Sequence, residues 1–315
     1  MIQGFIIENQ TSKQRVTLGM NPKYDYVYKD DGLDWGYANA SHSTYSYPGQ
    51  VGEKISMTNI QGRDISFTGY VHYLPSKVDI SNYSREGLQI LVRDKIEEKK
   101  GVLNSLINPM DHLKVIVGDF YLEGKPTRSI QYGQTVSENN EYFCMFEISI
   151  YCENPMFHKV KSANTVIAGS SPGFHFPLSI PDTGYFISTR IDYLIISCEN
   201  EGNATVGGVI TITAQGTVKN PVIENIETGE KFTIYKTLSD GEVVEINTTQ
   251  GENRGIKGGI GGATQNYFKY WDYENDWIEF GVGNTMVGYT ADDDTQVNMT
   301  VKVVIAPEKY GLEDQ

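Results

Sequence analysis

The sequence predicts a mainly β protein of two domains with one substantial helix. Three observations indicate this class. The chain has 315 residues, more than one domain usually needs. Segments rich in Val, Ile, Thr and Tyr recur between Gly, Asn and Asp clusters, which is typical of short strands joined by tight turns. Helical spacing is found in only one stretch, residues 81–109, so the first domain is predicted to be α+β.

The first 75 residues are predicted to form strands, at 5–7, 15–18, 24–28 and 63–71. In the last of these, RDISFTGYV, Ile65 and Phe67 alternate with Ser66 and Thr68, with Gly69 and Val71 continuing the first set. This is the period of two expected of a strand with one buried face. Residues 29–54 are rich in Gly, Ser, Tyr and Asp and are predicted to form a long loop.

The helical stretch places four apolar residues on one face, Leu88, Leu91, Val92 and Ile96. Ser84 is the predicted N-cap and Gly101 the predicted end of the helix. The following segment, VLNSLINP, adds a second short apolar turn that Pro109 ends. An apolar stripe of this kind needs a sheet to lie against.

Residues 113–157 return to a strand pattern. Within 143–152, the more uniformly apolar set is predicted to face the core: Cys144, Phe146, Ile148, Ile150 and Cys152. The first domain is therefore predicted to span residues 1–157, with an irregular connection or arm at 158–190. Residues 191–315 contain about eight strand candidates with turn signals at short intervals, which predicts a β-sandwich.

Charge and cysteine content exclude several classes of function. The formal charge of −14 argues against nucleic-acid binding, and the nearest basic pair, Lys99 and Lys100, is expected to oppose the dipole at a helix end. Three cysteines without CxxC spacing fit neither a disulfide framework nor a zinc site, so buried thiols are expected. No stretch approaches the roughly 18 apolar residues of a membrane span, and no leader is recognisable, so we expect folding in a cytosol and no membrane insertion.

Catalytic patterns are absent from the sequence. The five histidines are scattered, and no HExxH, GxSxG or phosphate-binding Gly-Lys-Ser/Thr motif occurs. The run GIKGGIGGAT at 255–264 lacks nucleotide-loop spacing and is interpreted as a flexible loop. Asp292, Asp293 and Asp294 lack the spacing of a calcium loop, so no metal and no cofactor is assigned. A glycan hydrolase would need two facing carboxylates, and no pair is singled out.

One segment is a candidate binding site for sugars, YWDYENDWIEF at 270–280. Trp271, Tyr273 and Trp277 could offer flat apolar faces to sugar rings, and the interspersed carboxylates could accept hydroxyl hydrogen bonds. The alternative is a hairpin whose Glu-Asn-Asp turn is exposed while Trp277 packs inward.

Taken together, several pieces in a fixed order resemble the distal tail proteins of tailed bacteriophages, the siphophage tail-component (Dit-like) family. They are RDISFTGYV, the helix, LNSLINP, FEISIYCENPMF, and the run NEGNATVGGVITITAQGTVKNPVIENIETGEKFTI. The positions carrying the resemblance are expected to be structural: Arg63, Phe67, Gly69, Leu103, Leu106, Asn108, Pro109, Asn154, Pro155, Asn220 and Pro221. The three Asn-Pro pairs are also explained simply as strand or helix terminators.

The resemblance implies a non-enzymatic virion protein at the tail tip or baseplate, made in the cytoplasm of the bacterial host. Its first domain would combine a β-sandwich, a helix and a β-hairpin and close into a six-fold ring, a homo-hexamer. Its second domain would be a galectin-like β-sandwich. Expected partners are the tail tube protein, a tail-associated tip or hub protein and receptor-binding proteins, with DNA only passing through the ring.

A closed ring needs a rigid module with two different complementary faces, which a helix-braced sheet with a projecting hairpin can supply. We place that hairpin between residues 119 and 145. The segments 29–54 and 158–190 are extra length that could dock other baseplate proteins or form solvated loops. The alternative function, from a different class, is a carbohydrate-binding receptor-binding protein that contacts polysaccharide on the host cell surface.

Overall fold

The protein is described by a computed structural model that covers residues 4–160, 163–168, 171–172, 188–189, 195–250, 254–261 and 265–312. The chain divides into two compact units. Unit 1 comprises Met1–Val160 and Lys309–Gln315, and unit 2 comprises Lys161–Glu308. The chain therefore leaves unit 1, forms unit 2 and returns, whereas the sequence analysis assigned the returning residues to the second domain. Most of the predicted connection at 158–190 lies outside the described residues.

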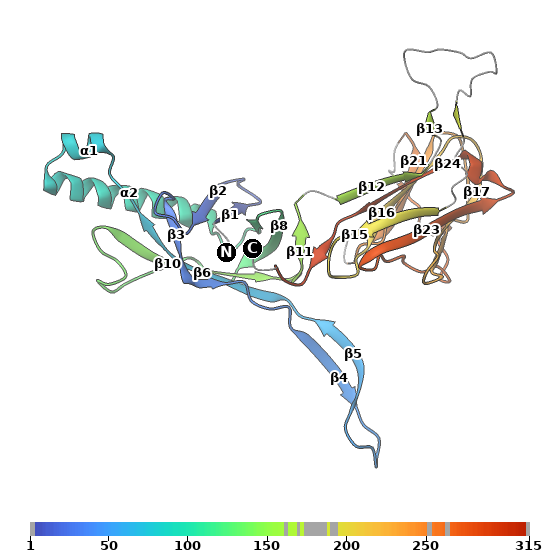
Figure 1. Ribbon diagram of the computed structural model, residues 1–315, viewed down its shortest axis with the longest axis horizontal. Coiled ribbons are helices and arrows are strands. Elements are labelled where there is room, and N and C mark those ends of the chain that lie inside the picture. The colour runs from blue at the N-terminus through green and yellow to red at the C-terminus, as the bar shows by residue number, and fades with distance from the viewer. Residues whose placement is uncertain are drawn as a thin grey trace. The chain divides into compact units, whose positions relative to one another are not determined.

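Unit 1 contains two helices, α1 (Lys77–Asn82) and α2 (Arg85–Leu106) (Figure 1). Its strands are β1 (Gly4–Asn9), β2 (Arg15–Gly19), β3 (Tyr26–Asp34), β4 (Ala40–Tyr45), β5 (Lys54–Ile60), β6 (Arg63–His72), β7 (Leu113–Val117), β8 (Phe120–Pro126), β9 (Gln131–Tyr132), β10 (Phe143–Cys152), β11 (Phe157–Lys159) and β25 (Glu308–Lys309).

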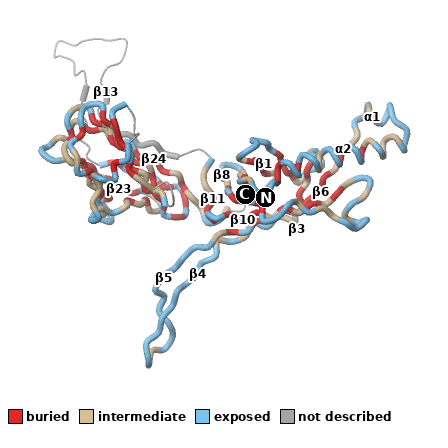
Figure 2. The backbone as a smooth tube through the Cα atoms, turned by 180° about the vertical axis from the view of Figure 1, so that it is seen from behind, coloured by how far each residue is buried: buried red, intermediate tan, exposed pale blue. Residues whose placement is uncertain are grey.

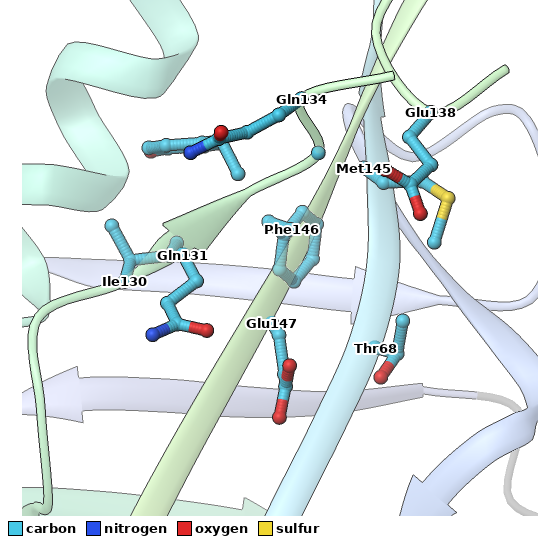
Figure 3. A pocket seen from close by; sticks show the side chains of 10 residues that line it. Thr68, Ile130, Gln131, Gln134, Glu138, Met145, Phe146 and Glu147 are labelled. Atoms are coloured by element: carbon cyan, nitrogen blue, oxygen red, sulfur yellow. The ribbon is translucent and has the colours of Figure 1, made fainter. Parts of the chain in front are cut away.

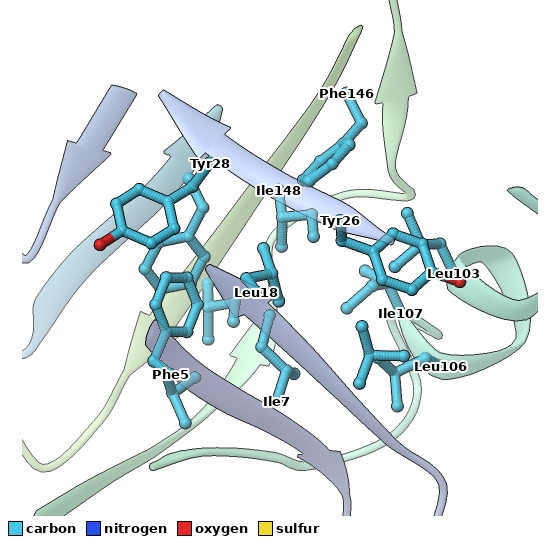
Figure 4. Packing of buried hydrophobic residues seen from close by; sticks show 14 of the residues in the cluster. Phe5, Ile7, Leu18, Tyr26, Tyr28, Leu103, Leu106, Ile107, Phe146 and Ile148 are labelled. Carbon is cyan, nitrogen blue, oxygen red and sulfur yellow. The ribbon is translucent and has the colours of Figure 1, made fainter. Parts of the chain in front are cut away.

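The main sheet of unit 1 closes on itself. Its strand order is β25-β11-β8-β7-β1-β2-β3-β6-β10-β9, and β8 also pairs with β10, so the strands from β8 to β10 form a closed circuit. Strands β2 and β3 run parallel. The enclosed core gathers apolar side chains from the sheet and from α2, including Phe5, Leu18, Phe146 and Leu106 (Figure 4).

Strands β6 and β10 confirm the alternation seen in the sequence. Residues 63, 65, 67, 69 and 71 of β6 are buried, as are all five residues of the predicted inward set of β10. The two strands pair antiparallel along their full length, with Phe67 opposite Ile148. Gly69 is required here, because a Cβ atom would lie 2.5 Å from the carbonyl oxygen of Val27 and 2.8 Å from the Phe146 ring.

Helix α2 begins as predicted but ends later. Ser84 is the N-cap, and its side chain accepts a hydrogen bond from the backbone amide of Gly87 at 3.2 Å. The prediction that Gly101 ends the helix is wrong. Nothing lies near the position that its Cβ would occupy, and the predicted separate turn is the last part of the same helix, ending at Leu106. Val92 and Ile96 are buried, while Leu88 and Leu91 are half-buried.

Helix α1 was not predicted. It is held by a capping box in which the Ser76 hydroxyl and the Asp79 carboxylate each accept from the other's backbone amide. Lys99 and Lys100 lie within α2 and not at its end. Lys99 pairs with Asp25, and Lys100 pairs with Glu97.

We expect Ser84→Ala to lower the free energy of unfolding of unit 1 by about 1 kcal/mol, because one amide in the first turn of α2 loses its acceptor. Chemical denaturation monitored by circular dichroism measures this change. Ser105→Ala, on the exposed side of the same helix, is the control and should change the stability by less than about half as much. Equal effects of the two substitutions would contradict a capping role for Ser84.

Unit 2 is a β domain of two main sheets around one core. Its elements are β12 (Ala163–Ala168), β13 (Ser171–Pro172), β14 (Ser188–Thr189), β15 (Ile195–Asn200), β16 (Gly208–Ala214), β17 (Val218–Asn225), β18 (Lys231–Thr233), β19 (Thr237–Leu238), β20 (Glu242–Asn247), β21 (Gly255–Ile260), β22 (Gln265–Asn266), β23 (Gly283–Asp292) and β24 (Met299–Ile305), with short 3-10 helices η1 (Phe268–Tyr270) and η2 (Thr295–Asn298). The predicted mainly β class is therefore confirmed.

The sheets of unit 2 correct three predictions. One sheet has the order β12-β24-β16-β20-β21-β22, and the other has β15-β23-β17-β18 with β19 paired to β17. One of the strand candidates of the sequence, WIEFGVG at 277–283, makes only an isolated bridge, between Val206 and Phe280, before β23 begins at Gly283. The predicted flexible loop at 255–264 is instead strand β21 over 255–260. There Gly258 lies beneath the Tyr267 ring, which a Cβ atom would approach to 2.2 Å.

The third correction concerns Asn220 and Pro221, which were interpreted as strand terminators. They lie inside β17, at a register shift between Lys219 and Val222. Asn220 has a φ of 44°, and its side-chain amide donates to Asp292 at 2.8 Å. A proline can occupy a strand at such an irregularity, because the ladder hydrogen bond that it cannot make is already interrupted.

Candidate assembly site

An exposed hairpin projects from the closed sheet of unit 1 (Figures 1 and 2). Strands β4 and β5 form it, and every residue of both strands is exposed. We call residues 37–60 the arm. The predicted long loop at 29–54 is therefore wrong. Residues 119–145, where the projecting hairpin was predicted, contain β8, β9 and the start of β10, and β9 pairs antiparallel with β10.

The arm carries large apolar side chains without a core of its own. Those that are exposed are Tyr37, Tyr45, Tyr47, Val51, Ile55, Met57 and Ile60. A two-stranded hairpin is at best marginally stable alone in water, and contiguous exposed apolar surface marks an interaction site. The arm therefore has the character of a surface that is completed by another molecule.

The base of the arm is tightly packed against the sheet. Gly36 has a φ of 60°, and a Cβ atom there would lie 2.0 Å from the carbonyl oxygen of Asp64. On the returning strand, a Cβ atom at Gly62 would lie 2.3 Å from the Tyr151 hydroxyl. The backbone amide of Gly36 also donates to the Asp34 carboxylate at 2.8 Å. These close approaches fix the direction in which the arm leaves unit 1.

A second exposed apolar surface lies on the other elements of unit 1. Its exposed residues are Leu74 before α1, Ile80 in α1, Tyr83 between the helices, Ile90 in α2, and Val136 and Tyr142 in the loop before β10. Gln89 of α2 donates to Glu141 of that loop at 2.8 Å, which joins the two segments. Unit 1 thus presents two different apolar surfaces, as a head-to-tail contact between copies requires.

Two hollows on unit 1 have mixed linings. One, of about 660 Å³, is lined by residues of β9, β10 and the adjoining loop, among them Gln131, Gln134, Glu138 and Glu147 (Figure 3). Hydrogen bonds from Thr135 hold the pKa of Glu138 below its usual range. The other, of about 760 Å³, lies between β2, the start of β3 and α2. Among the residues that the structure describes, no group of three or more His, Cys, Asp or Glu could hold a metal.

The positions that carry the family resemblance in unit 1 lie in its core or at element ends. Phe67 packs against Phe5, with ring centroids 4.7 Å apart, and Leu103 and Leu106 are fully buried. Asn108 and Pro109 follow α2. Asn154 and Pro155 follow β10, where the Asn154 side chain accepts from the Met156 amide at 3.0 Å. Their predicted role as terminators fits these places.

Arg63 is the exception among these positions, because it is a charged side chain in the core. It is 2 % exposed, and its guanidinium lies over the Phe157 ring at 4.8 Å from the centroid. Its Nη2 donates to the backbone carbonyl oxygen of Tyr310. Burial lowers the pKa of the guanidinium. No pattern in the sequence indicates this partner, which lies 247 residues away along the chain.

The predicted sugar-binding residues of unit 2 are only partly brought together. Trp271 and Trp277 stack with centroids 5.9 Å apart and planes inclined by 27°. Trp277 also contacts the Phe232 ring and lies beneath the Arg254 guanidinium, so it packs inward as the alternative interpretation predicted. Tyr273 is 84 % exposed and is not part of this stack.

A buried ion pair stabilises one sheet of unit 2. Glu242 is 3 % exposed, and its carboxylate accepts from Lys236 at 2.6 Å, from the Ser239 amide at 3.0 Å and from the Tyr267 hydroxyl at 2.7 Å. Burial alone would raise the pKa of Glu242, but these hydrogen bonds outweigh it and hold the pKa below its usual range. Burial and the bond to Glu242 raise the pKa of Tyr267 to about 12.

The three thiols are free and buried, as expected from the sequence. They are Cys144, Cys152 and Cys198. Burial raises the pKa of Cys152 to about 12 and that of Cys198 to about 11. No helix among the described residues has the length and apolar content to cross a membrane.

Comparison with known proteins gives a family match in unit 2. Residues 201–303 match the family model of the siphovirus-type tail component, C-terminal domain. No curated protein matches the chain.

Solved structures extend the likeness over the whole chain. The crystal structure of the Dit protein (gp 19.1) of phage SPP1 is similar with a TM-score of 0.59 at 10 % identity, covering 96 % of this chain and 98 % of that chain. Chains of the phage P2 baseplate in its activated conformation, one with Ca and one with Sr, match at 12 % identity. Their TM-scores are 0.38 and 0.39, and they cover 96 % of this chain and 98 % and 97 % of those chains.

The match to a siphovirus-type tail component thus covers residues 201–303 of unit 2, and the whole chain shares the fold of SPP1 Dit. In both respects the chain is similar to the Dit-like distal tail proteins. This confirms the resemblance found in the sequence.

Proposed function

We propose that this protein is the hub of a phage tail, in which six copies of unit 1 close into a ring that joins the tail tube to the baseplate or tail tip. The proposal is supported by the fold shared with SPP1 Dit, a protein described as a paradigm of the hub adsorption apparatus in phages that infect Gram-positive bacteria. In this role the protein is not an enzyme and belongs to the virion. Unit 2, with a galectin-like fold, anchors tip or receptor-binding proteins.

The observation that carries the proposal is the arm. Burying a side chain such as Ile55 or Met57 contributes about 1.5–3 kcal/mol, and in the single chain both remain exposed. A copy of unit 1 that covers the arm of its neighbour while offering its own arm to the next makes a heterologous contact, and such contacts close into a ring. In this contact, the arm of one copy would pack against the second apolar surface of unit 1 in the neighbouring copy.

The charge of the protein suits a conduit for DNA. With a formal charge of −14, the assembled ring would repel a passing duplex more than hold it. This part of the proposal is tested by a reconstruction of the ring, in which a lumen lined chiefly by Lys and Arg would contradict it.

The copy number is tested by light scattering coupled to size-exclusion chromatography, with negative-stain imaging of the same fraction. The expected mass is six times the 35.3 kDa of the chain, and the expected images are rings. A tail-tip preparation containing one copy, away from the tail axis, would contradict the proposal.

A second candidate function concerns unit 2, where Tyr273 offers an exposed ring between Asp272 and Glu274. Such a site could bind polysaccharide of the host surface. If it does, Tyr273→Ala should weaken binding of the full chain to host cell-wall polysaccharide at least tenfold, as measured by biolayer interferometry. Tyr235→Ala, which removes another half-exposed tyrosine of unit 2, is the control. Unchanged binding, or no binding by the parent chain, would contradict this function.

A further inference from the structure

The segment that returns from unit 2 is built into unit 1. Its strand β25 pairs with β11 at one end of the main sheet. The Lys309 ammonium lies 5.2 Å from the centroid of the Phe120 ring, and Leu312 packs against the core of unit 1. Three kinds of contact, from backbone pairing, a cation over a ring and apolar packing, therefore hold residues 308–312.

Arg63 links this segment to the buried core of unit 1. Among the described residues it is the largest fully buried side chain, and the carbonyl oxygen of Tyr310 accepts from its Nη2. The Nε atom of Arg63 is buried without a hydrogen-bond partner among the described residues. The carbonyl oxygen of Tyr310 is therefore an important acceptor for the buried guanidinium. A buried cation that loses an acceptor strongly destabilises the fold, because the hydrogen bond no longer offsets the free-energy cost of removing the cation from water.

The order of these elements along the chain adds a consequence. Arg63 and its ring partner Phe157 both precede unit 2, whereas Tyr310 follows it. A growing chain thus contains the whole of the remaining unit 1 sheet long before the acceptor for Arg63 is available. Unit 1 can be completed only by residues that come after unit 2.

We propose that residues 308–312 act as a clasp that unit 1 needs to complete its fold, so that only a chain containing both units becomes competent to assemble. The assembly part of this inference rests on the ring proposed above, while the clasp itself does not. Incomplete chains, which would leave a ring without anchoring domains, are thereby kept out of it.

The test uses the full chain with two independent changes. Arg63→Met keeps the length of the side chain but removes its charge and donors. Replacement of Lys309–Leu312 by Gly-Ser-Gly-Ser removes the packing and keeps the chain length. Arg93→Met, on the exposed side of α2, is the matched control. Hydrogen exchange reports the amides of β8 and β11 in unit 1 and of β20 in unit 2, and light scattering reports the mass.

We expect at least tenfold faster exchange in β8 and β11 for both variants, unchanged exchange in β20, and loss of the high-mass species. Exchange equal to that of the parent in the Gly-Ser variant overturns the clasp, even if Arg63→Met fails to fold. Faster exchange with the mass retained overturns the link to assembly. If the parent chain itself is monomeric, the ring is contradicted, and the exchange rates still decide the clasp.

Discussion

A chain that carries Ile55→Asp and Met57→Asp together should remain folded but fail to form the ring. Both side chains are exposed in the single chain, at 59 % and 63 %, so the protomer loses no packing. In a contact between copies, each substitution removes about 2 kcal/mol of apolar burial and adds a carboxylate that must be desolvated. Because a loss of 1.4 kcal/mol weakens an equilibrium tenfold, each contact should weaken at least a thousandfold. Light scattering should then show only the protomer mass.

The matched control places the same chemistry on unit 2. Ile260 and Val282 are exposed at 75 % and 61 %, and their replacement by Asp adds the same charge without touching the arm. This control should form the ring, and both variants should unfold at the temperature of the parent monomer. A ring formed by the arm variant would show that the arm is not an assembly surface.

Glu242→Gln should lower the free energy of unfolding of unit 2 by about 3 kcal/mol at pH 7. The substitution keeps the shape of the side chain but leaves the Lys236 ammonium beside an uncharged amide in a largely buried place. Breaking a buried ion pair on one side costs about 3–5 kcal/mol, because the remaining charge is left unpaired. Denaturant unfolding followed by tryptophan fluorescence measures the loss, since Trp271 and Trp277 lie in the same unit.

The pH dependence of this effect has a definite sign. The pKa of Glu242 is lower in the folded protein, so its contribution is fully present above the unfolded pKa of about 4.3 and is lost as the pH falls through the folded pKa. The parent should therefore lose more stability than Glu242→Gln on acidification below about pH 4. Glu245→Gln, three residues along β20, is the control and should parallel the parent. A constant difference between parent and Glu242→Gln down to about pH 2 would contradict this role.

The parts of the fold that were predictable are those with a buried face. The period of two in β6 and β10 records which side chains meet the core, and the structure confirms it. Of the predicted stripe of α2, Val92 and Ile96 meet the core. The burial of Cys144 and Cys152 followed from their place in the inward set of β10. In these elements the local residue pattern agrees with the burial in the folded protein, so the sequence alone predicts which side chains face the core.

Elements without a buried face were not predicted, because their sequences carry no pattern that records contact with a core. Every residue of both arm strands is exposed, so neither strand has a side that meets the core. Strand β4 shows no alternation of apolar and polar residues, and the alternation of Ile55 and Met57 with Ser56 and Thr58 in β5 does not mark a buried face. In β21, Gly258 allows the close approach of the Tyr267 ring. The abundance of glycine in this segment is typical of a loop, which is why a loop was predicted. Helix α1 had a usable signal, the Ser-x-x-Asp spacing of residues 76–79, which was overlooked.

Site features that depend on distant partners were not accessible from the sequence. The acceptor of Arg63 lies in a segment that returns from another unit. The stacking of Trp271 on Trp277, and the separation of Tyr273 from that pair, depend on how a turn packs against Phe232 and Arg254. Composition and spacing constrain neither arrangement.

The buried thiols make this chain a convenient background for site-specific labelling. A maleimide reacts with the thiolate, and burial both shields Cys144, Cys152 and Cys198 and keeps them protonated at neutral pH. A cysteine introduced at Val51, which is fully exposed at the tip of the arm, would then be the reactive thiol of the folded protein. A fluorophore placed there would test the proposed passage of the arm from solvent into a contact with a neighbouring subunit.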